Sequence, residues 1–301
     1  MTGETMETEF AALLDRVSHH RALHDGVGIH YAALGEGPLL VMIHGWPDCW
    51  YTWRRQMPAL AARYRVAAMD LRGYNLSDQP QGGEAYRMRT LLGDVEAVIA
   101  DQGAERAIVM AHDWGGMIAW SLAMHRPQRV AGLVICNLPH PWCLVRELAR
   151  GGAQHAASEY ARRFQAPESH RHLNVERLLG ILPAGAPREA YREAFERSDL
   201  AAMMHYYREN FAREPYALPA GAPAPVTCPV LMFHGLDDPA LLPDTLNETW
   251  RHVAAPLTLV TVPGAAHWVQ EDAWARVNAT TVDWLAREFA DGALTSRPGG
   301  G

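Results

Sequence analysis

The sequence predicts an α/β protein: a mostly parallel β-sheet flanked by helices, with an all-helical segment inserted as a cap. Three observations carry this prediction. Short apolar runs rich in Val, Ile and Leu alternate with longer amphipathic segments, which is typical of parallel strands joined by helices. The stretch 107–120 has the pattern of a buried strand, a sharp turn and a helix. The alternation stops after residue 137 and resumes after residue 222, with no convincing strand between.

The composition is that of a soluble protein with a large core. The chain has 301 residues, of which 49% are hydrophobic and 20% charged, and a formal net charge of −7. This charge argues against a nucleic-acid partner, since phosphate contacts need clustered cations. All 27 basic residues are arginine, which excludes a Schiff-base lysine and a P-loop.

No membrane or export signal is evident in the sequence. No apolar run reaches the roughly 18 residues of a membrane span, and the first residues lack the apolar region of a signal peptide. We therefore expect a cytoplasmic protein with no membrane partner. The oligomeric state is not determined by these observations, and a homodimer stays open.

The cysteines and clustered histidines have packing explanations. The cysteines show no C-x-x-C spacing, so we expect reduced residues that serve in packing. Four histidines crowd a hairpin near the N-terminus, but strand alternation places them on mixed faces, which favours a solvated edge over a metal site. We expect neither a metal nor a cofactor. The residues concerned are Cys49, Cys136, Cys143 and Cys228, and His19, His20, His24 and His30.

The expected elements follow one another along the chain. Residues 1–18 form a surface helix or a loose arm, and Asp25-Gly26-Val27-Gly28 joins the two strands of the hairpin. The expected strands are 19–25, 29–33, 39–43, 66–69, the run that begins at 107, 130–136, 230–234 and 257–262. The helices outside the insertion are 50–63, 89–102, 116–125, 243–253 and 272–290. Those inside it are 142–150, 155–165, 174–182, 187–197 and 198–213.

These elements divide into one interrupted core and one insertion. We expect residues 1–137 and 223–291 to form the α/β core, residues 138–222 the helical cap, and residues 292–301 a disordered tail. The stretch 219–225 contains only Pro, Ala and Gly, and is expected to be a stiff linker between cap and core. No internal repeat is present, so an inserted cap explains the chain better than two tandem domains.

The strand–turn–helix at residues 107–120 has the pattern of a nucleophile elbow, G-x-S-x-G, with two differences. The residue at the apex is Asp113 instead of serine, and the first small residue is Ala111 instead of glycine. Alanine is still small enough for strand and helix to pass closely. A carboxylate is already ionised at neutral pH, so it attacks a saturated carbon without a base, which suits alkyl transfer rather than acyl transfer.

The ends of the other predicted strands supply the remaining candidates, because open parallel sheets place their sites at the carboxyl ends of strands. His44-Gly45-Trp46-Pro47 follows one strand and Asn137 another. The last two strands are followed by Asp237-Asp238 and by Ala265-Ala266-His267-Trp268. The candidates occur along the chain in the order nucleophile, acid, histidine, which is the order in α/β-hydrolases.

With these motifs the sequence resembles the α/β-hydrolase superfamily and, within it, the epoxide hydrolases. The resemblance extends from about residue 20 to residue 290 and includes 44–54, Gly73-Tyr74, 112–116 and 265–268. It implies that Asp113 forms an ester with substrate and that His267 activates the water that hydrolyses it. The acid that orients this histidine is expected to be Asp238 rather than Asp237, since it matches the family's G-x-x-D spacing. Asn137, where some relatives carry the acid, cannot ionise.

The resemblance also assigns supporting roles. Backbone N–H groups of Trp46 and Trp114 are expected to form the oxyanion hole, and Trp46, Trp114 and Trp268 to line the substrate pocket. Two cap tyrosines of the family protonate the alkoxide that leaves the epoxide. Tyr207 is in register with one of them, and Tyr160 lies about where the other is expected. Both tyrosines could instead be packing residues of the cap.

Two other functions stay open. A haloalkane or haloacid dehalogenase would use the same Asp113 but expel a halide. The tyrosines favour an epoxide, as does Trp46 where many haloalkane dehalogenases have asparagine and Trp114 where the fluoroacetate type has arginine. A catalytically inactive binding protein of the same fold would lack a member of the Asp113–Asp238–His267 set, and none is missing. The sequence thus favours an enzyme that converts a small-molecule epoxide and water into a vicinal diol.

Overall fold

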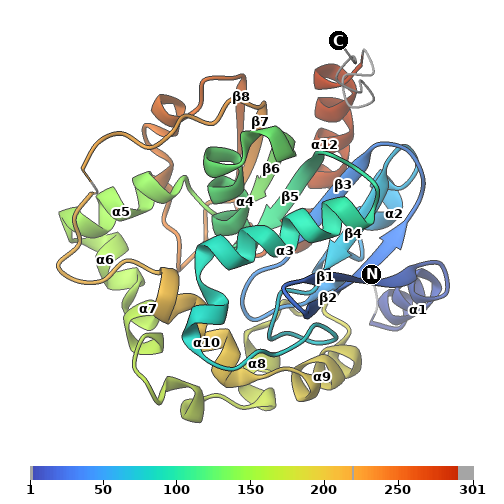
Figure 1. Ribbon diagram of the computed structural model, residues 1–301, viewed down its shortest axis with the longest axis horizontal. Helices are drawn as coiled ribbons and strands as arrows, with labels where there is room; N and C mark the ends of the chain where they lie inside the picture. The colour runs from blue at the N-terminus through green and yellow to red at the C-terminus, as the bar shows by residue number, and fades with distance from the viewer. Residues whose placement is uncertain (1–2, 219, 291–301) are drawn as a thin grey trace.

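The computed structural model describes residues 3–218 and 220–290, and its centre is one eight-stranded sheet (Figure 1). The strand order is β1-β2-β4-β3-β5-β6-β7-β8. β2 pairs antiparallel with β1 and with β4, and all the other neighbouring strands are parallel. The strands are β1 (Ser18–His24), β2 (Val27–Leu34), β3 (Leu39–Ile43), β4 (Arg65–Met69), β5 (Ala107–His112), β6 (Val130–Cys136), β7 (Val230–Gly235) and β8 (Leu257–Val262). The predicted α/β-hydrolase fold is confirmed.

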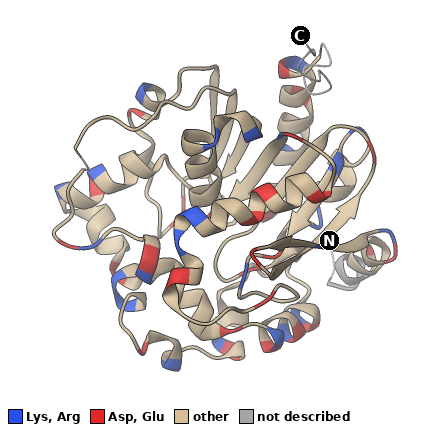
Figure 2. Ribbon diagram, viewed as in Figure 1, with Lys and Arg blue, Asp and Glu red and all other residues tan. Residues whose placement is uncertain are grey.

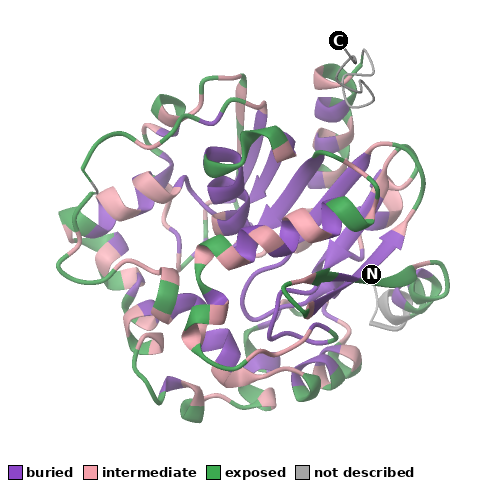
Figure 3. Ribbon diagram, in the orientation of Figure 1, coloured by how far each residue is buried: buried purple, intermediate pink, exposed green. Residues whose placement is uncertain are grey.

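The middle of the sheet is buried on both sides, as Figure 3 shows. Every residue of β3, β5, β6 and β7 is buried, which is why these strands read as continuous apolar runs instead of alternating ones. Two pairs of helices cover the faces. α3 (Met88–Asp101) contacts α4 (Trp114–His125), and α2 (Gln56–Leu60) contacts α12 (Trp274–Glu288). A further helix, α1 (Gly3–Leu14), precedes the first strand.

Residues 138–222 lie between β6 and β7, and all of them except residue 219 are described. Their regular elements are helices, with no strand among the described residues. They are α5 (Pro141–Arg150), α6 (Ala153–Ala157), α7 (Glu159–Phe164), α8 (Val175–Ile181), α9 (Arg188–Arg197) and α10 (Leu200–Asn210). In Figure 1 they gather on one side of the sheet, beside the ends where the central strands finish. Figure 2 shows charged residues concentrated on helices and loops, whereas the central strands carry almost none.

Three predicted helices differ from those in the structure. The expected helix 50–63 is two pieces, the 3₁₀ turn Trp50–Trp53 and α2. The expected helix 243–253 is two 3₁₀ turns, Pro243–Leu246 and Thr249–His252, because Glu248 between them has a left-handed backbone (φ 62°). The expected helix 155–165 is two separate helices, α6 and α7. The expected helix 272–290 corresponds to α12, with the short helix α11 (Val269–Asp272) before it. The expected tail 292–301 lies outside the described residues.

None of the cysteines forms a disulfide. Cys49, Cys136 and Cys143 are buried and Cys228 is half-buried, as packing residues would be. The histidine-rich hairpin forms an imidazole–carboxylate chain rather than a solvated edge alone: His19 Nδ1 lies 2.8 Å from His30 Nε2, and His30 Nδ1 lies 2.7 Å from Asp70 Oδ2. No described helix has the length and apolarity that a bilayer crossing needs.

Candidate active site

Asp113 sits at the sharp turn between β5 and α4, with a backbone that an L-residue rarely adopts (φ 50°, ψ −120°). The turn is tight because α4 starts against the preceding strand. A Cβ on Gly115 would lie 2.2 Å from the Ile43 carbonyl oxygen and 2.6 Å from that of His44. Only glycine fits at position 115, and the close approach holds Asp113 in its strained conformation.

The Asp113 carboxylate has two different partners. Its Oδ1 accepts a hydrogen bond from the Trp46 backbone N–H at 2.7 Å, and its Oδ2 lies 3.6 Å from His267 Nε2. Burial alone would raise the pKa of this carboxyl. Attraction to His267 and His112 and the Trp46 N–H outweigh burial, so the pKa lies below its usual value. The group is a buried, ionised carboxylate at neutral pH.

Asp238 lies behind His267 and accepts its Nδ1–H on Oδ2 at 2.8 Å. The same oxygen accepts a bond from the Asn137 side-chain amide at 2.6 Å, and Oδ1 accepts the backbone N–H groups of Ala240 and Leu241 at 2.8 and 3.1 Å. Despite burial, which opposes ionisation, attraction to His267 and these hydrogen bonds hold the pKa of Asp238 well below its ordinary range. Asp238 is therefore ionised, and its hydrogen bond fixes the orientation of the His267 ring.

His267 is flanked by two carboxylates, and this decides its protonation. Burial favours the neutral imidazole, but Asp238 and Asp113 together outweigh it and raise the pKa of His267 to about 10. Part of that opposition to burial comes from a group that an ester would neutralise, since Asp113 contributes both a hydrogen bond and a charge. His267 is an imidazolium in the unreacted protein and becomes a stronger acid if Asp113 loses its charge.

A small cavity opens directly over Asp113. Both predicted tyrosines reach it: Tyr160 from α7 and Tyr207 from α10. Their rings lie 6.2 Å apart and nearly perpendicular. Burial and the negative charge of Asp113 raise both pKa values, so both hydroxyls stay protonated at neutral pH. Apart from these three residues the lining is apolar: Trp114, Met117, Leu138, Leu144, Phe211 and Leu241.

The three tryptophans occupy different places. Trp114 lines the cavity, packs on Tyr207 with ring centroids 5.0 Å apart, and hydrogen-bonds the Tyr207 hydroxyl. Trp46 packs on Phe164 and Tyr207 behind the cavity wall. Trp268 lies beside His267 and donates its indole N–H to Asp48 at 2.9 Å. Trp46 and Trp268 are not among the lining residues, and their place in a substrate pocket stays a prediction.

Two residues of the site were not identified by sequence reasoning. Asn137 was considered only as a position where no acid stands. Its side-chain Nδ2 donates to Asp238, and its side-chain Oδ1 accepts the Gly235 N–H at 2.9 Å. Asp48 receives hydrogen bonds from Trp268 and from the Tyr191 hydroxyl at 2.6 Å. The available signal was that Asn137 directly follows a predicted strand and that Asp48 lies within the 44–54 stretch that carries the family resemblance. His112 is a structural hydrogen-bonding residue, since its Nε2 lies 2.9 Å from the His267 carbonyl oxygen.

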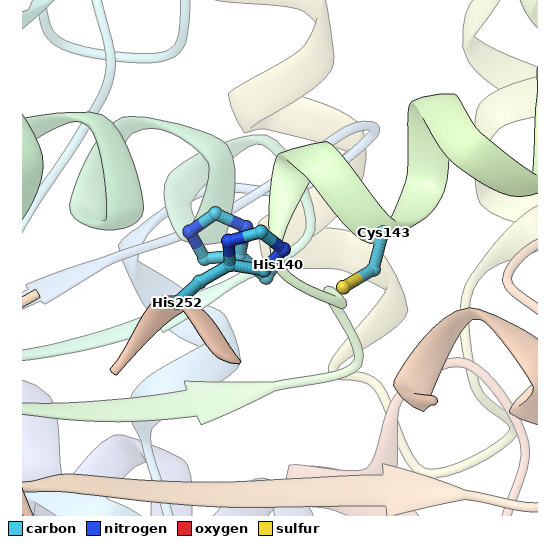
Figure 4. Close-up of side chains that lie close together, drawn as sticks. All are labelled: His140, Cys143 and His252. Carbon is cyan, nitrogen blue, oxygen red and sulfur yellow. The ribbon is translucent and has the colours of Figure 1, made fainter. Parts of the chain in front are cut away.

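One group of described side chains has metal-ligand chemistry: the potential ligand atoms of His140, Cys143 and His252 lie within 4.8 Å of one another (Figure 4). The two imidazole rings stack at 4.4 Å with an angle of 12° between their planes. Lone pairs in parallel planes do not converge on one ion, and His140 Nδ1 already accepts the Trp142 N–H at 3.3 Å. The geometry is that of a packed aromatic pair, and we assign no metal to it.

Comparison with known proteins agrees with the geometry. A family model described as the alpha/beta hydrolase fold matches residues 38–273, so the chain belongs to the α/β-hydrolase superfamily. Within it the chain belongs with the epoxide hydrolases. It is 31% identical over 288 residues to epoxide hydrolase 4 of Mus musculus, covering 89% of this chain and 79% of the mouse protein.

Two further relatives are similar over more of their length. The AB hydrolase superfamily protein YfhM of Bacillus subtilis is 35% identical, with 88% of this chain and 96% of the relative covered. The crystal structure of an epoxide hydrolase from Bacillus megaterium superposes with a TM-score of 0.81 at 29% identity, covering 88% of this chain and 99% of the other.

Proposed function

We propose that this protein is an epoxide hydrolase that forms a covalent alkyl ester on Asp113, and that residues 138–222 act as the cap over its site. One observation carries the proposal. An ionised carboxylate at a strained turn faces a mostly apolar cavity in which two protonated tyrosines are the other polar groups of the lining. A nucleophile and two acids on the same cavity match the needs of epoxide opening, in which a carbon is attacked while an oxygen is protonated.

The first step forms the ester. Asp113 Oδ2 attacks an epoxide carbon, the carbon–oxygen bond breaks, and the departing oxygen takes a proton from Tyr207 or Tyr160. Oδ1 is held by the Trp46 N–H, which leaves Oδ2 as the attacking atom. The first residues of α4 have N–H groups without intrahelical partners beside the same carboxylate, which fits the predicted role of Trp114 as second oxyanion donor.

The second step hydrolyses the ester. Asp113 no longer carries charge, so His267 loses one of the two carboxylates that raise its pKa. It passes its proton to the tyrosinate that ring opening left, and as a neutral imidazole it can act as a base. It takes a proton from water, whose oxygen attacks the Asp113 carbonyl carbon. The resulting oxyanion lies on Oδ1, where the Trp46 N–H donates to it. Collapse expels the diol oxygen, which takes the proton back from His267.

The protons and oxygens balance over the cycle. Water gives one hydrogen to the second hydroxyl of the diol through His267. The other stays on the regenerated Asp113 carboxylic acid and passes to neutral His267, which restores the starting imidazolium and carboxylate. One oxygen of Asp113 leaves in the diol, and the oxygen of water replaces it. The reaction is therefore epoxide plus water to vicinal diol, with no cofactor in any step.

The test is to trap the ester. With His267→Gln the first step proceeds and the second stops, so incubation with styrene oxide is expected to raise the protein mass by one substrate on the peptide that contains Asp113. Asp113→Asn is the matched control and should stay unlabelled. In wild type, a single turnover in ¹⁸O-water should place the heavy oxygen in Asp113 and not in the diol. Heavy oxygen in the diol alone would refute the covalent mechanism.

The same proteins separate the alternatives. Wild type is assayed in parallel with styrene oxide for diol and with 1-bromobutane for bromide. Bromide without diol would identify a dehalogenase, because halide release needs the Asp113 ester but no acid from the tyrosines. Neither product, together with no mass increase in His267→Gln, would identify a binding protein of this fold.

A further inference from the structure

Gln154 connects the helical insertion to the loop of the acid. Its side chain is 3% exposed, although it projects from the short helix α6. Its Nε2 donates to the Ala240 carbonyl oxygen at 2.8 Å, and its Oε1 accepts the Leu242 N–H at 2.8 Å. One amide therefore pairs with both the acceptor and the donor of a backbone segment, as a neighbouring strand would. Such a pair fixes the segment in position and in direction.

The segment it holds is the one that surrounds the Asp238 carboxylate. The N–H groups of Ala240 and Leu241 donate to Asp238 Oδ1, while the Ala240 carbonyl and the Leu242 N–H face Gln154. A shift of this backbone would move the donors that keep Asp238 ionised and aimed at His267. Leu241 also lines the cavity over Asp113. Gln154 thus acts on the acid without touching it.

A third bond from Gln154 leads to the tyrosine. Its Nε2 also donates to the Ser158 hydroxyl at 2.9 Å, and Ser158 is 2% exposed. Ser158 lies immediately before α7, and its carbonyl accepts the N–H of Ala161 at 3.1 Å, which starts the first turn of that helix. Tyr160 stands in this turn and points into the cavity. The position of the tyrosine therefore depends on the same amide as the acid loop.

We propose that Gln154 is a positioning residue that holds the Asp238 loop and the Tyr160 helix in one register across the boundary between core and insertion. The inference rests on the proposed function, since the two groups it aligns act in different steps: Tyr160 in ring opening and Asp238 in ester hydrolysis. Removing the Gln154 amide should therefore slow both steps, whereas removing the Ser158 hydroxyl should slow only the first.

The test measures the two steps separately by single-turnover quench with styrene oxide, following ester and diol. Gln154→Met keeps the volume and removes all three hydrogen bonds. We expect both rates to fall about tenfold or more, since displacements of about 1 Å cost up to roughly a hundredfold. The acid limb of the hydrolysis rate should also move to lower pH, because a displaced Asp238 supports the protonated His267 less. Ser158→Ala should slow ring opening and leave the pH profile of hydrolysis unchanged.

Two controls separate positioning from loss of stability. Asn278→Met deletes a part-buried amide of α12 that donates to the Arg55 carbonyl and touches neither Asp238 nor Tyr160. It should lower the melting temperature without changing either step. In a Tyr160→Phe background, Ser158→Ala should add no further loss in ring opening. If Gln154→Met does not fold, this comparison of Ser158→Ala with and without the Tyr160 hydroxyl tests whether the bonded segment positions Tyr160.

Two results would overturn the inference. One is a Gln154→Met protein with both rates and the pH profile within twofold of wild type. The other is a loss in ring opening that Ser158→Ala produces equally with and without the Tyr160 hydroxyl. Wild type that forms no ester at all is a different outcome, because it removes the proposed function and not the alignment by Gln154.

Discussion

At the scale of single residues, the chemistry depends on charge balance around one imidazole. His267 lies between the carboxylates of Asp113 and Asp238, and its proton is held by both. In the proposed mechanism one histidine serves two states: it is a cation while Asp113 is free and a base once Asp113 is an ester. The same balance makes the folded protein sensitive to pH.

The first prediction concerns stability. The pKa of His267 is about 10 in the folded protein and near 6.5 when unfolded, so the native state binds the proton more tightly. Its contribution is full below about pH 6.5 and is lost as pH rises toward 10. Urea unfolding at pH 6.5, 8 and 9.5 should show wild type and His267→Gln converging in free energy of unfolding. A constant difference across this range would contradict the charge balance.

The second prediction concerns the tyrosines. Tyr207→Phe should slow ring opening by roughly tenfold to a hundredfold, because general acids contribute about 10²–10⁴-fold and Tyr160 shares the task. Hydrolysis of the ester should be unchanged, since no alkoxide of the epoxide forms in that step. Rapid-quench measurement of ester and diol separates the two. Tyr216→Phe, a tyrosine of the same insertion outside the cavity lining, is the matched control. Equal slowing of both steps would remove Tyr207 from the role of acid.

The residues of the proposed triad could be identified because each follows a strand or begins a recognisable motif. Asp113, Asp238 and His267 stand where sheet topology brings strand ends together, and the structure places them in contact. Gln154 could not be found this way. Its partners are 86 and 88 positions away in the chain, and a buried glutamine in a short helix carries no periodic signal.

At the scale of elements, the strands were easier to predict than the helices that connect them. The four central strands match because burial on both faces leaves an uninterrupted apolar run. The segment 50–63 had helical spacing, but Arg54 turns inward to Glu271 and the chain forms two short pieces instead. A tertiary ion pair overrides local propensity there, and no local pattern reveals a partner more than two hundred residues away.

The third prediction concerns the turn at the head of α4. Gly115→Ala places a Cβ against the carbonyl oxygens of Ile43 and His44, and backbone atoms cannot move aside as side chains do. We expect a loss of about 1–3 kcal/mol in the free energy of unfolding, together with a displaced Asp113 and slower ester formation. The comparison is Gly180→Ala in α8, where an added Cβ would meet no neighbouring atom within 4 Å outside its own helix backbone.

The expected result for Gly180→Ala is a gain of up to about 1 kcal/mol from helix propensity. Chemical denaturation of the two variants beside wild type measures the contrast. If Gly115→Ala were as stable and as active as wild type, the close approach of β3 and α4 would not be what holds Asp113.

At the scale of the whole molecule, core and insertion are joined through buried polar contacts as well as apolar packing. Arg54 donates two hydrogen bonds to Glu271, each 2.6 Å long, and a third to the Gly185 carbonyl of the insertion at 2.9 Å. Both ionic side chains are 6% exposed. Burial raises the pKa of Glu271 to about 7 although Arg54 opposes the shift. The pair holds the insertion against the helix that follows His267.

The fourth prediction follows from this pair. Arg54→Met leaves Glu271 buried without its main partner and should cost about 3–5 kcal/mol of stability. The loss should grow as pH rises above about 7, because the unpaired carboxyl must then ionise or stay protonated at a cost. Arg54→Met combined with Glu271→Met should recover most of the loss. Denaturation at pH 6 and pH 8 provides the measurement, and a double variant as weak as the single one would contradict it.

The rate at which the buried thiols react with a disulfide reagent measures how often each part of the structure opens. Only a thiolate reacts with a disulfide reagent such as DTNB, and Cys49, Cys136 and Cys143 are at most 1% exposed, with pKa values raised by burial. Cys143 belongs to α5 in the insertion, whereas Cys136 is the last residue of β6 and Cys49 precedes the 3₁₀ turn Trp50–Trp53 of the core. Early labelling of Cys143 alone would record lifting of the insertion, and simultaneous labelling of all three would record unfolding of the molecule as one unit.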